Sequence, residues 1–130
     1  MPGPAARKLT VYEIPAEVTL EVFRVVKVSS IADPALADSF RSHFELKRPP
    51  RKIEATFIVV HMGVSCWRSE EGARKLATSY PTIGAHVARL EIEGGKGFNA
   101  SSSVLGGSQH LTVWGDPIKL AAVVTDVVPV

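Results

Sequence analysis

Apolar and polar residues alternate along several stretches of this chain, and the alternation predicts strands. Residues 18–28 (VTLEVFRVVKV) are rich in β-branched side chains, which favour a strand. Residues 85–93 (AHVARLEIE) alternate as a half-exposed strand does. Residues 123–130 predict a closing strand. Two further stretches are strand-like, 55–60 (ATFIVV) and 63–67 (GVSCW), with a bend between them.

Three helices are expected, each after a capping signal. In each case a serine or aspartate precedes the helical pattern, and such a side chain accepts hydrogen bonds from the first backbone N–H groups of a helix. Two of these residues are followed by proline, which suits the first helical position. The predicted helices run from Pro34 to about Glu45 after Asp33, over residues 70–80 after Ser69, and over residues 118–122 after Asp116-Pro117.

Strands and helices follow one another without a regular strand–helix–strand repeat, which favours an α+β fold over a doubly wound sheet. We expect a compact mixed sheet with two main helices and one short helix. Residues 1–14 are expected to form a disordered N-terminal tail. Residues 15–130 are expected to form a single domain, because a chain of 130 residues is near the usual size for one. The glycine- and serine-rich residues 94–108 predict a long loop.

Composition narrows the class of protein. The chain is 45% hydrophobic and 22% charged, which is ordinary for a globular domain. Its formal net charge of +2 gives little reason to expect a nucleic-acid partner. Cys66 is its one cysteine, so no internal disulfide can form. The four histidines show no close-spaced ligand pair and Cys66 has no partner cysteine, so no metal site is indicated. Neither a membrane-spanning run nor a secretory signal is evident, so we expect a cytoplasmic protein.

The strand predicted around residues 109–117 carries the most suggestive side chains. Alternation places His110, Thr112 and Trp114 on one face. This face can line a polar pocket, with His110 as a general acid or base, Thr112 as a hydrogen-bonding partner, and Trp114 or Trp67 stacking on a flat ring. Alternatively, His110 bonds a backbone carbonyl and Trp114 fills the core. The sequence leaves both interpretations open.

Three further features could bind an anion or another polar ligand. Arg24 lies in the middle of an apolar strand face, so it is either an anion clamp or a side chain whose stem packs while its head reaches water. Ser65 could contact a ligand, but it lacks the glycine-flanked turn of a hydrolase nucleophile. The basic residues 47–52 predict a solvated turn, or else a site for a dinucleotide phosphate or an RNA backbone.

Three segments resemble the ADP-ribosyltransferase-like superfold. They are Val22–Val26, which looks like its arginine-bearing first strand, the basic connection Arg48–Arg51, and residues 63–73, which look like its strand leading into a capped helix. RES-domain toxins and RNA 2′-phosphotransferases are the most similar branches in layout. The whole chain also resembles a group of small actinobacterial proteins that share a His-Leu/Tyr-Thr-Leu/Val-Trp-Gly-Asp-Pro motif near the C-terminus.

This resemblance implies a split sheet that grips NAD⁺. Arg24 would hold the pyrophosphate, Ser65 and Trp67 would lie near the nicotinamide ribose, and His110 and Thr112 would line the cleft as catalytic residues. The protein would cleave NAD⁺ or transfer ADP-ribose, as the toxin of a two-gene system, with an antitoxin or a second copy as partner.

One departure from the superfold weighs against catalysis. Most active members use a late glutamate, and none follows Glu93 here. The alternative is a non-catalytic module that binds a protein or a small ligand. A third hypothesis is RNA binding through residues 47–52.

Overall fold

The computed structural model describes residues 11–49, 61–102 and 109–130. Within them, seven strands form one sheet in the order β1-β5-β6-β3-β2-β4-β7. The expected α+β class is confirmed, although the strand pairings are all antiparallel where we expected mixed directions. The strands are β1 (Tyr12–Glu13), β2 (Thr19–Val26), β3 (Val64–Trp67), β4 (His86–Glu93), β5 (Asn99–Ser102), β6 (His110–Trp114) and β7 (Val124–Pro129).

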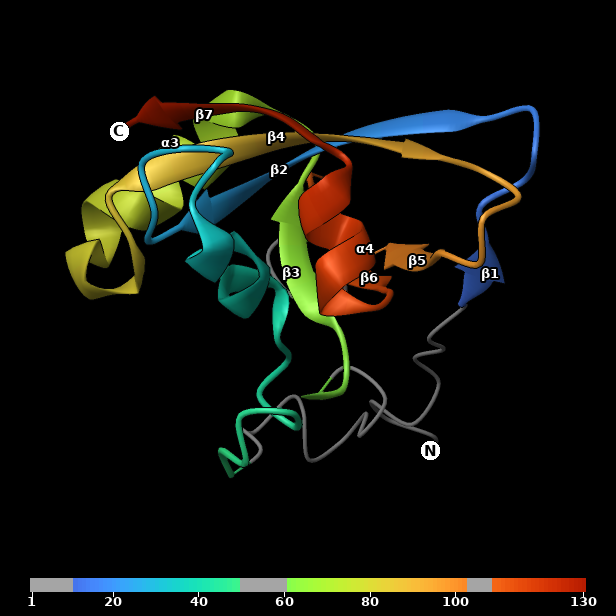
Figure 1. Cartoon of the computed structure of the whole chain (residues 1–130), viewed down its shortest axis with the longest axis horizontal. Coiled ribbons are helices and arrows are strands. Elements are labelled where there is room, and N and C mark those ends of the chain that lie inside the picture. The colour runs from blue at the N-terminus through green and yellow to red at the C-terminus, as the bar shows by residue number, and fades with distance from the viewer. Residues whose placement is uncertain (1–10, 50–60, 103–108) are drawn as a thin grey trace, which may run out of the picture.

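The sheet has a narrow junction between β2 and β3. Strand β2 pairs with β4 along its full length, from Thr19 opposite Glu93 to Val26 opposite His86. By contrast, β2 and β3 share only the pair Phe23 and Trp67. Figure 1 shows β2, β4 and β7 running across the view while β3 runs down it. Two half-sheets, β7-β4-β2 and β3-β6-β5-β1, therefore meet at a single pair of residues.

Helices cover both faces of the sheet. The 3₁₀ helix η2 (Pro34–Phe40) and helix α4 (Pro117–Ala122) contribute Leu36, Phe40 and Leu120 to the larger core. Helix α3 (Glu70–Ser79) places Ala73 and Ala77 in a second, smaller core on the other face, and the short 3₁₀ helix η3 (Pro81–Ile83) follows it. The larger core also receives Val22 and Val26, whereas the smaller one receives Phe23, Val25 and Val87, as strand alternation requires.

The three predicted helix caps are confirmed. The side chain of Asp33 accepts a hydrogen bond from the N–H of Ala35, that of Ser69 from Gly72, and that of Asp116 from Ile118 and Lys119. These caps depend on residues two or three positions away, so they could be predicted from the local sequence.

The first helix is shorter than predicted. It ends at Phe40 instead of about Glu45, because Arg41 has extended dihedral angles and Ser42 begins a separate turn. In that turn the Ser42 hydroxyl accepts from the N–H of Glu45 at 3.1 Å, while the Glu45 carboxylate accepts from the N–H of Ser42 at 2.9 Å. This reciprocal capping box satisfies two donors and favours a new start at Ser42.

Two short strands lie where no strand was predicted. Strand β5 forms inside the expected loop 94–108, and β1 forms inside the expected N-terminal tail. They pair with each other through Tyr12 opposite Ala100, and Ile14 is only 1% exposed. Long-range pairing and burial order these residues, although their own sequences carry little strand signal. The strand predicted at residues 55–60 lies outside the described residues.

Candidate ligand-binding site

Strands β3 and β6 bring together four of the predicted site residues. Ser65 lies opposite Thr112, and Trp67 lies opposite His110. Side chains of directly opposed residues share one face of an antiparallel pair, so these four form a polar row on the face that α3 partly covers. The Trp67 and His110 rings meet edge to face, with centroids 5.0 Å apart.

The β6 half of this polar row is buried. His110 and Thr112 are each only 4% exposed, whereas Ser65 and Trp67 on β3 are half-buried. Gly63 lies directly against the row, because a Cβ atom at this position would lie 2.5 Å from the Thr112 Cγ2 atom. Burial, and to a lesser extent the positive charge of Arg24, lowers the pKa of His110 to about 4. The imidazole is therefore neutral at physiological pH and enclosed by protein. The catalytic roles predicted for His110 and Thr112 stay predictions.

Arg24 lies on the other face of the sheet. Phe23 is opposite Trp67, so the next residue along β2 points the opposite way, and the Arg24 guanidinium carbon lies 6.0 Å from the centroid of the Phe40 ring. Its Nε donates to the Ser39 carbonyl oxygen and its Nη1 to the Ser65 carbonyl oxygen, both at 2.7 Å. The guanidinium does not share the face of His110, Thr112 and the Ser65 side chain.

Arg24 thus links β2, β3 and η2 next to the narrow junction. Its two hydrogen bonds are charge-assisted, which makes them stronger than neutral ones. Burial lowers the pKa of the Arg24 guanidinium, but an arginine keeps its proton in a protein. The neighbouring thiol of Cys66 has its pKa raised to about 11 by burial, so it is an unreactive core side chain. The arrangement around Arg24 joins elements of the fold, and the predicted phosphate-clamp role stays a prediction.

One surface hollow lies away from the polar row. It has a volume of about 620 Å³ and is lined by Phe44, Glu45, Lys47, Arg48, Pro49 and His61. A second hollow of about 200 Å³ lies beside α3 and is lined in part by Trp67, the predicted stacking residue. Of these two hollows along the described residues, the first has the volume usual for small-molecule sites, about 300–1,000 Å³. We refer to it as the turn pocket.

The turn pocket is built on one tight turn. After the capping box at Ser42, the N–H of Lys47 bonds the Phe44 carbonyl at 3.0 Å and the N–H of Arg48 bonds the His43 carbonyl at 2.9 Å. These two bonds form the Schellman pattern, in which the residue after the last helical one adopts a left-handed conformation. Lys47 is that residue, with φ of 57°, and within the described residues no other non-glycine residue has a positive φ.

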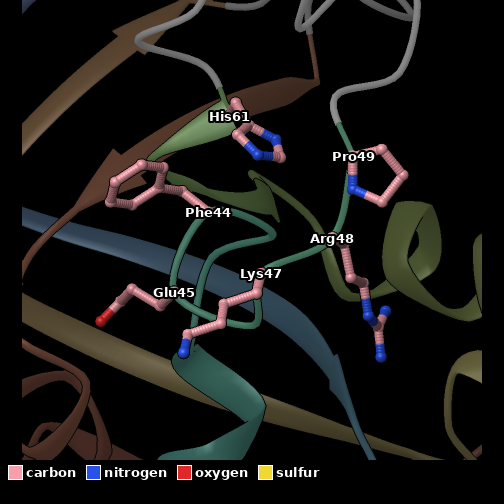
Figure 2. A pocket seen from close by; sticks show the side chains of 6 residues that line it. All are labelled: Phe44, Glu45, Lys47, Arg48, Pro49 and His61. Atoms are coloured by element: carbon pink, nitrogen blue, oxygen red, sulfur yellow. The ribbon is translucent and has the colours of Figure 1, made fainter.

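Rings and positive charges line the turn pocket together. Figure 2 shows the Phe44 and His61 rings near each other, while the Lys47 and Arg48 side chains extend from the turn with their charged ends directed away from the two rings. The Phe44 and His61 rings meet edge to face at 6.1 Å, and the N–H of Phe44 bonds the His61 carbonyl. Phe44 is 54% exposed. Neither Lys47 nor Arg48 forms an ion pair within residues 11–49, 61–102 and 109–130.

Sequence reasoning found only part of this pocket. The sequence shows the basic stretch 47–52, of which residues 50–52 lie outside the described residues. The spacing of Ser42 and Glu45 is the signal that would have located the turn, since it matches a capping box. The left-handed conformation of Lys47 carries no signal in its residue type.

The comparisons with known proteins add no family. No family model, curated protein or solved structure matches this chain. Among the described residues, no three histidine, cysteine or acidic side chains gather as metal ligands would, and no helix is long and apolar enough to span a bilayer. Any role for the candidate site must therefore be inferred from its geometry and chemistry.

Replacing Arg24 tests its structural role. Arg24→Met should lower the free energy of unfolding by about 2–4 kcal/mol, because two half-buried carbonyl oxygens lose a charged donor. Arg89→Met is the matched control, since Arg89 pairs with Glu21 and Glu91 at the surface, and exposed pairs contribute below about 1 kcal/mol. Urea unfolding measures both variants. Equal losses would show that the Arg24 bonds contribute no more than a surface ion pair.

The buried imidazole predicts a loss of stability in mild acid. The pKa of His110 is about 4 in the folded chain, against about 6.5 when unfolded. Between these values the unfolded chain binds a proton that the folded chain does not, so the free energy of unfolding falls as the pH falls. This single group should contribute on the order of 2–3 kcal/mol to the fall. Urea unfolding at neutral and acidic pH should show a weaker pH dependence in His110→Asn; an unchanged dependence would refute this assignment.

Proposed function

We propose that this protein is a non-catalytic binding module whose turn pocket holds a small anionic ligand with a planar ring, of the nucleotide class. The observation that carries the proposal is the conformation of Lys47. This residue lines the pocket and occupies a left-handed position with φ of 57°. Such a position favours glycine, and a residue with a Cβ atom is destabilised there by roughly 1 kcal/mol.

A lysine at this position needs a reason other than stability. Glycine would complete the same Schellman pattern with less strain, because the pattern needs only backbone atoms. Strained residues gather at functional sites, where the surrounding structure holds them in place. At this turn the residue in the strained conformation is a lysine, so a positive charge lines the pocket next to that of Arg48. The side chain of Lys47 is therefore the natural candidate for ligand contact.

The lining suits a nucleotide better than a purely apolar molecule. Arg48 presents a planar fork of donors that matches phosphate, and Lys47 adds a second compact charge. Phe44 is more than half exposed, so its ring face can stack on a base or a nicotinamide. The carboxylate of Glu45 is engaged in the capping box, which limits its repulsion of an anion. NAD⁺, the ligand expected from the sequence, belongs to this class.

The proposal is for binding and not for turnover, because the groups expected to do chemistry are elsewhere. His110 and Thr112 are enclosed on the sheet, and neither lines the turn pocket. Arg24 is occupied by two backbone carbonyls. ADP-ribosyl transfer, and with it a toxin–antitoxin role, remains a prediction that a direct assay must decide.

Lys47→Gly separates stability from binding. It should raise the free energy of unfolding by about 0.5–1 kcal/mol, by relieving the left-handed strain. It should also weaken the binding of NAD⁺ or ADP by about tenfold, by removing a charge from the pocket. Lys96→Gly is the matched control, because Lys96 is an exposed lysine in a turn that does not line the pocket. Chemical unfolding and isothermal titration calorimetry measure the two effects.

The same samples distinguish the competing functions. If the wild-type protein binds neither NAD⁺ nor ADP, the proposed function is wrong. If Lys47→Gly and Lys96→Gly weaken binding equally, the ligand binds outside the turn pocket. Release of free nicotinamide from NAD⁺ would replace the binding module with the predicted ADP-ribosyltransferase-type activity. Tighter binding of a single-stranded RNA, falling steeply with salt, would favour the third hypothesis.

A further inference from the structure

The last strand of the sheet has the composition of a strand that pairs readily with other chains. Residues 123–130 read VVTDVVPV, with five valines and one charged residue. Segments of high β-propensity and low charge at an open edge promote edge-to-edge association. Strand β7 is the outermost strand on one side of the sheet. The opposite edge strand, β1, has only two residues and offers little to pair with.

The register shows which backbone groups of β7 face outward. The N–H of Val130 bonds the Ala85 carbonyl at 2.9 Å, so this pair uses groups that point toward β4. Opposed residues in an antiparallel ladder alternate between bonded and non-bonded pairs. Pro129, opposite His86, and Val127, opposite Ala88, are therefore in non-bonded pairs. Their backbone groups point away from β4, toward the open edge.

Most of these outward groups are already blocked. The N–H of Val127 donates to the Asp126 carboxylate at 2.9 Å. Pro129 has no N–H to offer. Its carbonyl oxygen accepts from the Nη1 of Arg74 at 3.0 Å, and Arg74 is held in turn by the Glu70 carboxylate at 2.9 Å. Among the described residues, the Val127 carbonyl is the one outward group of Val127 and Pro129 for which no partner is found.

We propose that Asp126 closes the β7 edge against pairing with β7 of a second copy of this chain. Arg74 contributes separately, by occupying the Pro129 carbonyl. Two copies of one edge strand pair antiparallel about a two-fold axis, which is the simplest closed assembly for such a surface. That pairing would need the Val127 N–H that Asp126 occupies. With the two-fold axis at Val127, the pairing would also bring two Asp126 carboxylates to diagonal positions on one face of the sheet, where like charges repel. This inference is independent of the proposed ligand.

Asp126→Val opens the edge in the test. The variant frees the Val127 N–H, removes the charge, and adds a sixth valine to residues 123–130. It should associate as its concentration rises, while the wild type remains a single species in sedimentation velocity. Thr125→Val is the matched control, because it adds an apolar β-branched side chain to the same strand and leaves the Asp126 bond intact. Asp126→Asn keeps an acceptor oxygen but removes the charge, so it should associate less than Asp126→Val and no less than the wild type.

Backbone hydrogen exchange supplies a second measurement. In dilute solution the Val127 amide should exchange more slowly in the wild type than in Asp126→Val, because only the wild type bonds it to a side chain. Association of the wild type through β7 would overturn the proposal, as would an Asp126→Val variant that stays monomeric at every concentration. Equal association of Thr125→Val and Asp126→Val would also overturn it, since added apolar surface would then explain both.

Discussion

The two hydrogen bonds donated by the Arg24 guanidinium join the sheet where its own ladder is thinnest. Strands β2 and β3 share one opposed pair of residues, whereas β2 and β4 share a full ladder. A gap in a ladder leaves backbone oxygens without strand partners, and buried oxygens without partners are costly. Arg24 fills that need for Ser65 on β3 and for Ser39 on η2 with one side chain. The charged Arg24 side chain on the apolar face of β2 therefore has hydrogen-bond partners.

The same junction sets the character of the neighbouring polar row. The Ser65 carbonyl oxygen accepts a hydrogen bond from Arg24, whose side chain lies on one face of the sheet. The Ser65 side chain lies opposite Thr112 on the other face. The charge of Arg24 and the burial of His110 both lower the pKa of that imidazole. A buried neutral histidine beside an aromatic ring is the arrangement expected of a packed sheet face. This row has the residue types of the predicted catalytic cleft, and a catalytic role for His110 and Thr112 stays a prediction.

The parts of the fold that could be predicted from the sequence are those set by neighbours along the chain. Asp33, Ser69 and Asp116 cap helices because their partners are two or three residues away. The main strands could be located from alternation, but not their order or their directions. Strand β5 escaped prediction because its residues (NASS) are polar and small, and only pairing with β1 and β6 makes them a strand. The groups that bind the Arg24 guanidinium, on Ser39 and Ser65, are likewise distant in the sequence.

The candidate site was harder to predict, because its main feature is a conformation and not a residue pattern. The basic stretch that begins at Lys47 is visible in the sequence, yet nothing there distinguishes Lys47 from Arg48. Only the backbone shows that Lys47 stands where glycine would be more stable. Stability alone would favour glycine at this turn, just as it favours the caps and the Arg24 bonds elsewhere. Lys47 is less stable than glycine at its position, and it lines a pocket of ligand size. We therefore take Lys47 as a stronger indication of function than a buried histidine such as His110.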